Sequence, residues 1–297
     1  MNRIIICILC LSLLCGCNGV AVQTQNDKIN IVTTIFPLYD FARQICGDNA
    51  DVKLLIKPGS EVHSYDPLPS DMAAIYNSDL FLYIGGESDK WATTLLDDNT
   101  INSRALIDDV NGQEEHHHGH DHTDEHIWTS PQNAILMLEA IFQSVTAIDA
   151  ENAEVYRQKC NDYIEKINQT SKEICDVVSQ YQEPFILVAD RFPFAYFTKH
   201  YGIDYEAAFD GCAVSTDISL KTMSRLTQTI EQRGVTTVFV TELSSQNIAK
   251  ALSNELGVKI LELHSAHNVS AIDFSSGISY VDIMYRNKLA LEEGLGF

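Results

Sequence analysis

The sequence predicts an α/β fold of two similar halves, each with a mostly parallel sheet flanked by helices, on either side of one long helix. Two observations favour this fold class. Short apolar runs typical of buried strands alternate with helical patterns in both halves of the chain. Between the halves, residues 150–181 carry apolar side chains at helical spacing throughout. The 297 residues, 45% of them hydrophobic, are enough to build two lobes with a real core.

The N-terminal half opens with a β-α-β unit. Residues 29–36 form a run of β-branched and aliphatic side chains, and Pro37 begins an amphipathic helix that reaches residue 46. Residues 52–56 form the next apolar run. The same signals then predict strands at residues 80–84 and 105–107 and helices at residues 69–77 and 90–96. This half is therefore predicted to be α/β.

The C-terminal half repeats this alternation after two helices. Helical spacing covers residues 131–148 and then the long segment 150–181. The remaining elements are predicted as strands at residues 185–189, 205–209, 237–241 and 258–263 and a last helix at residues 278–293. The second half is therefore expected to mirror the first in architecture.

The chain is strongly acidic. Asp and Glu outnumber Lys and Arg by 41 to 20, which gives a net charge of −21. Such a surface repels phosphate backbones and anionic lipid headgroups and attracts cations. We therefore expect no nucleic-acid partner.

Residues 1–17 have the pattern of a secretory signal peptide. Their apolar run, residues 4–15, is shorter than the roughly 20 residues of a membrane-spanning helix. It ends in Leu14-Cys15-Gly16-Cys17, which resembles the lipobox of bacterial lipoproteins and makes Cys17 the lipidated residue. A cleaved signal without lipid and an uncleaved signal remain alternatives. The polar residues 18–28 would form a tether.

Histidines are concentrated in one polar segment. Six of the ten histidines lie between Glu114 and His126, interleaved with acidic residues. Imidazole and carboxylate together suit borderline cations such as Zn²⁺. The apolar residues Ile127 and Trp128 follow at once, which predicts that His126 stands at the ordered edge of a mobile arm. The arm histidines are weaker metal candidates: His116, His117, His118, His120 and His122.

A metal-dependent hydrolase is an alternative function. Hydrolases of the metallo-β-lactamase type use H-x-H-x-D-H, and His120-Asp121-His122-Thr123-Asp124 approaches this motif, but His126 follows one residue too late. Neither H-E-x-x-H nor G-x-S-x-G occurs in the chain. Because no pair of nucleophile and base can be recognised, we expect a protein that is not an enzyme.

Three segments carry a family resemblance. They are the loop Gly59-Ser60-Glu61-Val62-His63-Ser64-Tyr65-Asp66-Pro67, the segment Asp124-Glu125-His126-Ile127-Trp128-Thr129-Ser130-Pro131, and the histidine-rich insertion just before that segment. Together they resemble the substrate-binding lipoproteins of zinc and manganese ABC importers, and the resemblance covers nearly all of residues 28–293. It implies that His63 and His126 bind the metal from the N-terminal lobe.

The ligands expected from the C-terminal lobe depart from the pattern of that family. Where the family has a histidine or glutamate, this chain has Arg191, whose guanidinium only donates hydrogen bonds and cannot coordinate a cation. Asp190 would take over after a one-residue shift, although an ordinary ion-paired acid explains it equally well. His264 would replace the acid that the family places after its last strand. The reserve candidates are His267, Glu242 and Cys212.

The resemblance also implies an architecture and a function. It implies two lobes bridged by a rigid helix, with the metal in the cleft between them and little hinge closure. Three histidines with one carboxylate favour Zn²⁺ over Mn²⁺. Such a carrier, lipid-anchored at the outer face of the cell membrane, captures the ion and delivers it to an ABC transporter permease. An adhesin-like surface role is an alternative for which no residue argues.

The expected organisation divides the chain into five segments. They are a signal peptide at residues 1–17, a tether at 18–28, an N-terminal lobe at 29–149 with the histidine-rich loop 114–126, a linking helix at 150–181 and a C-terminal lobe at 182–297. We expect the protein to act as a monomer.

Overall fold

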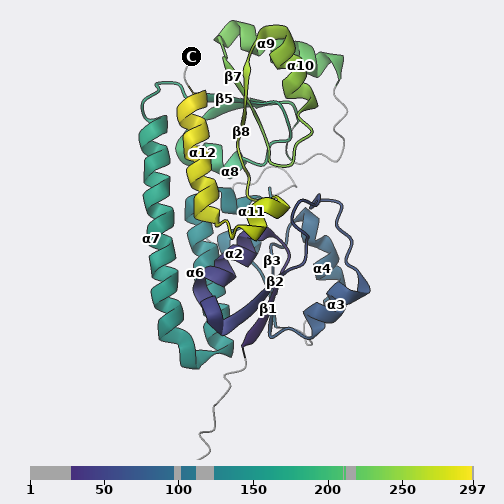
Figure 1. Cartoon of the computed structure of the whole chain (residues 1–297), viewed down its shortest axis with the longest axis vertical. Helices are drawn as coiled ribbons and strands as arrows, with labels where there is room; N and C mark the ends of the chain where they lie inside the picture. The colour runs from purple at the N-terminus through teal and green to yellow at the C-terminus, as the bar shows by residue number, and fades with distance from the viewer. Residues whose placement is uncertain (1–27, 97–101, 112–123, 210, 212–218, 296–297) are drawn as a thin grey trace, which may run out of the picture.

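Two α/β lobes form the structure, a computed structural model that describes residues 28–96, 102–111, 124–209, 211 and 219–295 (Figure 1). The parallel strands pair in the order β2-β1-β3-β4 in the N-terminal lobe and β6-β5-β7-β8 in the C-terminal lobe. Both lobes thus share one pairing order, which confirms the predicted fold class. The strands are β1 (Ile29–Thr33), β2 (Ala50–Leu54), β3 (Leu80–Tyr83), β4 (Ser103–Ala105), β5 (Phe185–Val188), β6 (Asp204–Ala207), β7 (Thr237–Val240) and β8 (Lys259–Glu262).

The helices begin where the sequence supplies a start signal. Prolines stand in the first turn of three of them, and serine side chains cap three others by accepting from a backbone N–H. The helices are α2 (Phe36–Cys46), α3 (Pro69–Tyr76), α4 (Lys90–Leu95), α5 (Ile107–Asn111), α6 (Pro131–Ile148), α7 (Ala153–Val178), α8 (Ala195–Tyr201), α9 (Leu220–Arg233), α10 (Asn247–Leu256), α11 (Ala271–Ser275) and α12 (Tyr280–Gly294). Within the described ranges, none of them combines the length and the apolar character that crossing a membrane requires.

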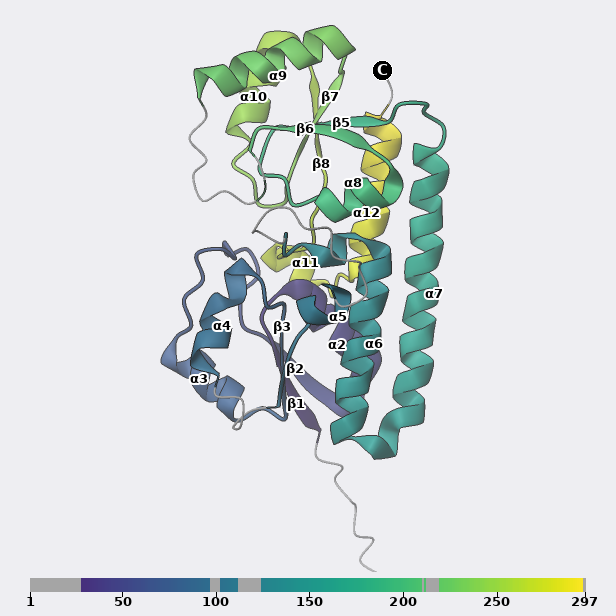
Figure 2. The same cartoon turned by 180° about the vertical axis from the view of Figure 1, so that it is seen from behind.

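The long helix α7 runs beside both lobes (Figures 1 and 2). It packs against α2 and α6 of the N-terminal lobe and against α12 near the end of the chain. Its buried side chains recur every three or four residues, as Tyr156, Cys160, Tyr163 and Ile167 illustrate, so they share one face. A single stiff element is therefore in contact with both lobes.

Most predicted elements differ from the observed ones by a few residues at their ends, and two of these differences have a visible cause. The long helix was expected over residues 150–181, but a 3₁₀ turn at Ala150–Asn152 precedes α7. The Asp149 carboxylate stabilises that turn because it accepts hydrogen bonds from the Asn152 amide and the Tyr156 hydroxyl. The strand expected at residues 105–107 lies earlier, because Ile107 already begins α5.

A buried carboxylate joins three helices. Asp40 of α2 is fully buried and accepts hydrogen bonds from Arg43 Nη2 at 2.7 Å and from the backbone N of Tyr280 in α12 at 2.8 Å. It also accepts from the hydroxyl of Tyr163 in α7 at 2.5 Å. A buried charge is stable only when it is paired and hydrogen-bonded, so these donors specify how α2, α7 and α12 meet.

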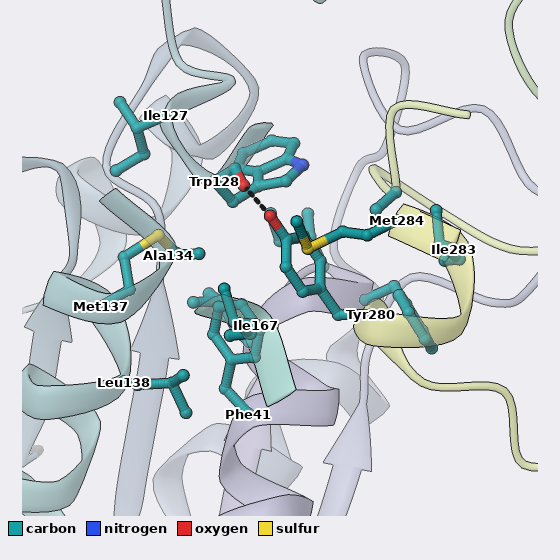
Figure 3. Close-up of a cluster of buried hydrophobic side chains, with 14 of the residues drawn as sticks. Phe41, Ile127, Trp128, Ala134, Met137, Leu138, Ile167, Tyr280, Ile283 and Met284 are labelled. Atoms are coloured by element: carbon teal, nitrogen blue, oxygen red, sulfur yellow. Dashed lines mark hydrogen bonds between the residues drawn. The ribbon is translucent and has the colours of Figure 1, made fainter. Parts of the chain in front are cut away.

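One apolar core continues between the lobes. It contains Phe41 of α2, Met137 of α6, Ile167 of α7 and Met284 of α12 (Figure 3). At its upper edge the Tyr280 hydroxyl donates a hydrogen bond of 2.6 Å to the carbonyl of Trp128. Burial of this shared surface opposes separation of the two lobes.

Candidate metal centre

Three histidines from distant parts of the chain meet between the lobes. Each of His63, His126 and His267 offers one ring nitrogen within 4.8 Å of the other two. His63 lies in the loop between β2 and α3, and His126 stands just before the 3₁₀ turn Ile127–Thr129 that leads into α6. His267 lies in the loop between β8 and α11. Such a cluster of nitrogen donors is a candidate metal site.

The cluster opens into a cavity of about 410 Å³. Loop residues from both lobes line it, among them Glu61 and His63 from the N-terminal lobe and Asp190, Arg191 and Glu242 from the ends of C-terminal strands. Both lobes are parallel α/β units, whose loops beyond the carboxyl ends of the strands commonly form ligand sites. The three histidines therefore stand where a ligand from solvent can reach them.

Asp124 orients the ring of His126. Its Oδ1 lies 2.6 Å from His126 Nδ1 and accepts the backbone N–H of His126 at 3.0 Å. Burial opposes ionisation of this carboxyl, but the hydrogen bonds and the charge of His126 hold the Asp124 pKa below its ordinary value. The carboxylate therefore fixes the proton on Nδ1 and leaves Nε2 as the metal donor.

Glu125 provides similar support for His63. The carboxylate is buried, and its Oε2 accepts from the backbone N and the hydroxyl of Ser88 at 2.8 and 2.9 Å. Its Oε1 lies 3.5 Å from His63 Nδ1. Two consecutive acids thus stand behind two of the imidazoles, the arrangement in which an outer carboxylate orients a metal-binding histidine.

His267 is the deepest of the three. Its Nε2 is buried and has no hydrogen-bond partner among the described residues. Burial, followed by the nearby rings of His126 and His63, lowers the His267 pKa well below its ordinary value, so the imidazole is neutral and able to coordinate. Tetrahedral zinc with Zn–N bonds near 2.0–2.1 Å places its donors about 3.4 Å apart. Small inward shifts from spacings of up to 4.8 Å would bring the three nitrogens to that separation.

Glu242 supports the loop that carries His267. Its two carboxylate oxygens accept hydrogen bonds from the backbone N and the hydroxyl of Ser265. The Ser265 hydroxyl oxygen in turn accepts the backbone N–H of His267 at 3.2 Å. On the other side, Trp128 Nε1 donates to the Ser265 carbonyl at 2.8 Å. Glu242 therefore lines the cavity and helps to position His267 indirectly, through its hydrogen bonds to Ser265.

His264 lies outside the three-histidine group. Its Nδ1 accepts from the backbone N of Ala266 at 2.9 Å, and its backbone exchanges two hydrogen bonds with the side chain of Asn287 in α12. It lines a separate small recess beside α12, and His267, which was a reserve candidate, lines the cavity instead. Of the two, the structure therefore brings only His267 close to His63 and His126.

Asp190 lines the cavity, but both of its carboxylate oxygens accept hydrogen bonds from other residues. Its Oδ2 accepts from the Thr241 hydroxyl at 3.1 Å, and its Oδ1 accepts from the backbone N of Arg191 at 2.8 Å. The Arg191 side chain reaches across the cleft, where Nη1 donates to Glu61 Oε2 at 3.1 Å. Glu61 Oε1 also accepts from the backbone N of His63 at 3.3 Å.

Several sequence candidates lie outside the described residues. They are Cys17, Cys212 and the arm histidines His116, His117, His118, His120 and His122. Sequence reasoning also assigned no role to Asp124 and Glu125. Acids directly before a ligand histidine can orient imidazoles, so the sequence did carry a signal. The histidine beside Glu125 is His63, however, which is far away in the sequence.

Known proteins resemble this chain over most of its length. The family model described as "Zinc-uptake complex component A periplasmic" matches residues 31–294. The zinc-binding lipoprotein AdcA of Streptococcus pneumoniae is 31% identical over 96% of this chain, which spans only 59% of that relative's length. The high-affinity zinc uptake system protein ZnuA of Bacillus subtilis is 27% identical over 96% of this chain and 95% of its own.

A solved structure gives the same fold. The crystal structure of the Zn(II)-bound ZnuA-like domain of Streptococcus pneumoniae AdcA matches with a TM-score of 0.77 and 29% identity. The match covers 90% of this chain and 99% of that domain. The two-lobed architecture implied by the sequence resemblance is confirmed.

The contact between Asp124 and His126 leads to a prediction. Asp124→Ala removes the acceptor that orients His126, so the affinity of the cluster for Zn²⁺ should fall by roughly 10–100-fold, the range typical of outer-shell partners. Asp124→Asn keeps an uncharged hydrogen-bond acceptor, so its affinity for Zn²⁺ should fall less. Competition with a chelator measures the affinity. Asp79→Asn is the control, because Asp79 accepts from the backbone of Asn30 at the opposite end of the sheet. An unchanged affinity in Asp124→Ala would show that this contact does not support the site.

Proposed function

Because the chain belongs to the family of periplasmic zinc-uptake components, we propose that it captures Zn²⁺ outside the cytoplasm and delivers it to the permease of an ABC transporter. The observation that carries this proposal is the group formed by His63, His126 and His267 in the cavity between the lobes. The pneumococcal relative is named a zinc-binding lipoprotein and the Bacillus relative a zinc uptake protein, which supports zinc as the ion.

The donor set supports a carrier of Zn²⁺ rather than of Mn²⁺. Three imidazole nitrogens suit zinc, whereas manganese prefers oxygen ligands. In this ligand set His267 takes the place that the sequence analysis gave to His264. The family is described as an uptake component and not as an enzyme, so the hydrolase alternative has no support from it. The protein is proposed to act as a monomer.

A lipid anchor at Cys17 would hold the carrier near its permease. The lipobox-like motif Leu14-Cys15-Gly16-Cys17 supports this anchor, as does the name lipoprotein of the pneumococcal relative. Residues 18–28 would then link the anchored cysteine to β1. In this proposal the lobes work at the outer face of the cell membrane.

Variants of His267 and His264 can show which of these two histidines binds the metal. His267→Ala should lower zinc affinity by more than about 100-fold, because loss of a direct ligand exceeds the ~10–100-fold cost of losing an outer partner. His63→Ala and His126→Ala should behave alike. His264→Asn, whose amide oxygen can still accept from Ala266, should stay within about threefold of wild type. Competition with a chelator measures the zinc affinity. If a folded His264→Asn variant lost as much zinc affinity as His267→Ala, His264 would have to be a zinc ligand.

The arm histidines are expected to add weaker sites. Replacing all five with asparagine should reduce the number of zinc ions bound per chain and leave the tight site intact, because a segment without apolar residues would lose more conformational entropy on binding. The weak sites should disappear between about pH 7 and 5.5, since coordination needs neutral imidazole with a pKa near ~6.5. Titration calorimetry at both pH values tests this. Loss of the tight site would mean that the arm supplies a primary ligand.

The arm variant must spare Asp124 and Glu125. These acids directly follow the arm and contact His126 and His63, so a deletion that reached them would also disturb the tight site. Substitution in place also leaves the length of the connection unchanged.

Membrane attachment is predicted to depend on Cys17. Cys17→Ala should move the processed protein from the membrane fraction to the soluble fraction, because acyl chains provide the apolar surface that anchors a lipoprotein. Fractionation followed by immunoblotting measures the distribution, and Cys175→Ala, at an exposed cysteine of α7, is the matched control. A processed Cys17→Ala protein that still sediments with membranes would contradict the lipobox interpretation.

A further inference from the structure

A positive side chain lines the cavity into which the three histidines open. Arg191 follows β5, and its Nη1 donates to Glu61 Oε2 at 3.1 Å. Its Nε is buried and has no hydrogen-bond partner among the described residues. A buried N–H donor without an acceptor is unfavourable, so this atom is suited to an acceptor that a ligand brings.

The unpaired atom belongs to the edge of the guanidinium that recognises carboxylates. Nε and Nη2 point in parallel and match the two oxygens of a carboxylate, whereas the contact with Glu61 uses Nη1. Arg191 can therefore keep its ion pair with Glu61 and still bind a second anion. Only a fifth of the Arg191 side chain is exposed, which strengthens such a contact relative to one in open solvent.

The metal shell, in turn, lacks a fourth protein donor. Within the described ranges, the group of close donor atoms contains three histidines and no carboxylate. Both oxygens of Asp190 accept other hydrogen bonds, and both oxygens of Glu242 are bonded to Ser265. Zinc held by three protein ligands keeps a fourth position for water or an exogenous ligand.

An anion in the cavity would lie between two positive groups. Zn²⁺ at the histidines and the guanidinium of Arg191 repel each other, and the carboxylates that line the cavity, Glu61, Asp190 and Glu242, already accept hydrogen bonds from protein donors. An anion that touches both cations would relieve this local repulsion. The cavity volume of about 410 Å³ lies within the range of small-molecule sites, far above what one ion fills.

We propose that the fourth zinc ligand is the carboxylate of a small organic anion that Arg191 holds, so that the cargo is a zinc–carboxylate complex. This inference rests on the proposed zinc-carrier function and names its substrate more closely. One carboxylate oxygen binds the metal, and the carboxylate also accepts from the Nε edge of Arg191. Arg191 stands at the position where the family has a metal ligand. In this proposal it holds the anion that supplies the fourth zinc ligand.

Cobalt provides the test, because Co²⁺ substitutes for zinc and its visible absorption reports the ligands around it. Acetate is added to the Co²⁺-loaded full chain in chloride-free buffer, with an equal concentration of chloride as the parallel arm. We expect a saturable spectral change with acetate and none with chloride. In Arg191→Gln, the acetate concentration at half saturation should rise at least about tenfold, as expected for loss of a charge-assisted hydrogen bond. Arg233→Gln, at a surface ion pair of α9, is the matched control.

A second pair of variants separates the anion site from the ion pair. Glu61→Gln removes the internal anion and keeps Arg191, so acetate should bind at least as tightly as in wild type. If Arg191→Gln does not fold, Arg191→Lys gives the same readout, because lysine keeps the charge and loses the paired donors. The inference is overturned if acetate does not change the Co²⁺ spectrum. It is also overturned if Arg191→Gln responds to acetate at the same concentrations as wild type. Weak Co²⁺ binding that does not depend on His63 would instead overturn the carrier function.

Discussion

The hydrogen bond from Trp128 Nε1 to the carbonyl of Ser265, 2.8 Å long, is the contact on which the metal centre depends. It joins the segment after His126 to the loop that carries His267. The same indole ring lies beside both imidazoles, with centroids 5.2 and 4.9 Å away. The hydroxyl of Tyr280 fixes the Trp128 carbonyl, so the tryptophan is held at both its side chain and its backbone. Because this residue is fully buried, the two histidines have little freedom to separate.

The loop after β8 belongs to one lobe by sequence and to the other by contact. Asn268 donates to the carbonyls of Lys57 and Ser60, and the backbone N of Gly59 donates to Val269. All three histidines are therefore fixed relative to the N-terminal lobe, although His267 follows the last strand of the C-terminal one. The same loop is also bonded to the C-terminal sheet, because Ser265 donates to Glu242 just after β7. The position of His267 therefore depends on contacts with both lobes.

The sequence predicted the fold and two of the three histidines of the cluster for identifiable reasons. Strand and helix periodicity is local, and His63 and His126 lie in contiguous motifs, so both could be found without coordinates. The choice between His264 and His267 could not, because it depends on Ala266, whose φ of 64° turns the chain between them. That turn directs His264 to α12 and His267 into the cavity. Likewise, the role of Glu125 depends on contacts with Ser88 and His63, which local pattern cannot reveal.

The acids around the site account for a preference for zinc over hard cations. Calcium and magnesium require several carboxylate or carbonyl oxygens, and the acids nearest the histidines already accept N–H or O–H donors. Asp124 is bonded to His126, Glu125 to Ser88 and Glu242 to Ser265, so their oxygens face protein donors. Their negative charge still favours a cation nearby, and the net charge of −21 attracts cations generally. What this part of the cavity offers for coordination is neutral imidazole nitrogen, with His267 kept neutral by burial, and that donor binds Zn²⁺ far better than it binds Ca²⁺ or Mg²⁺.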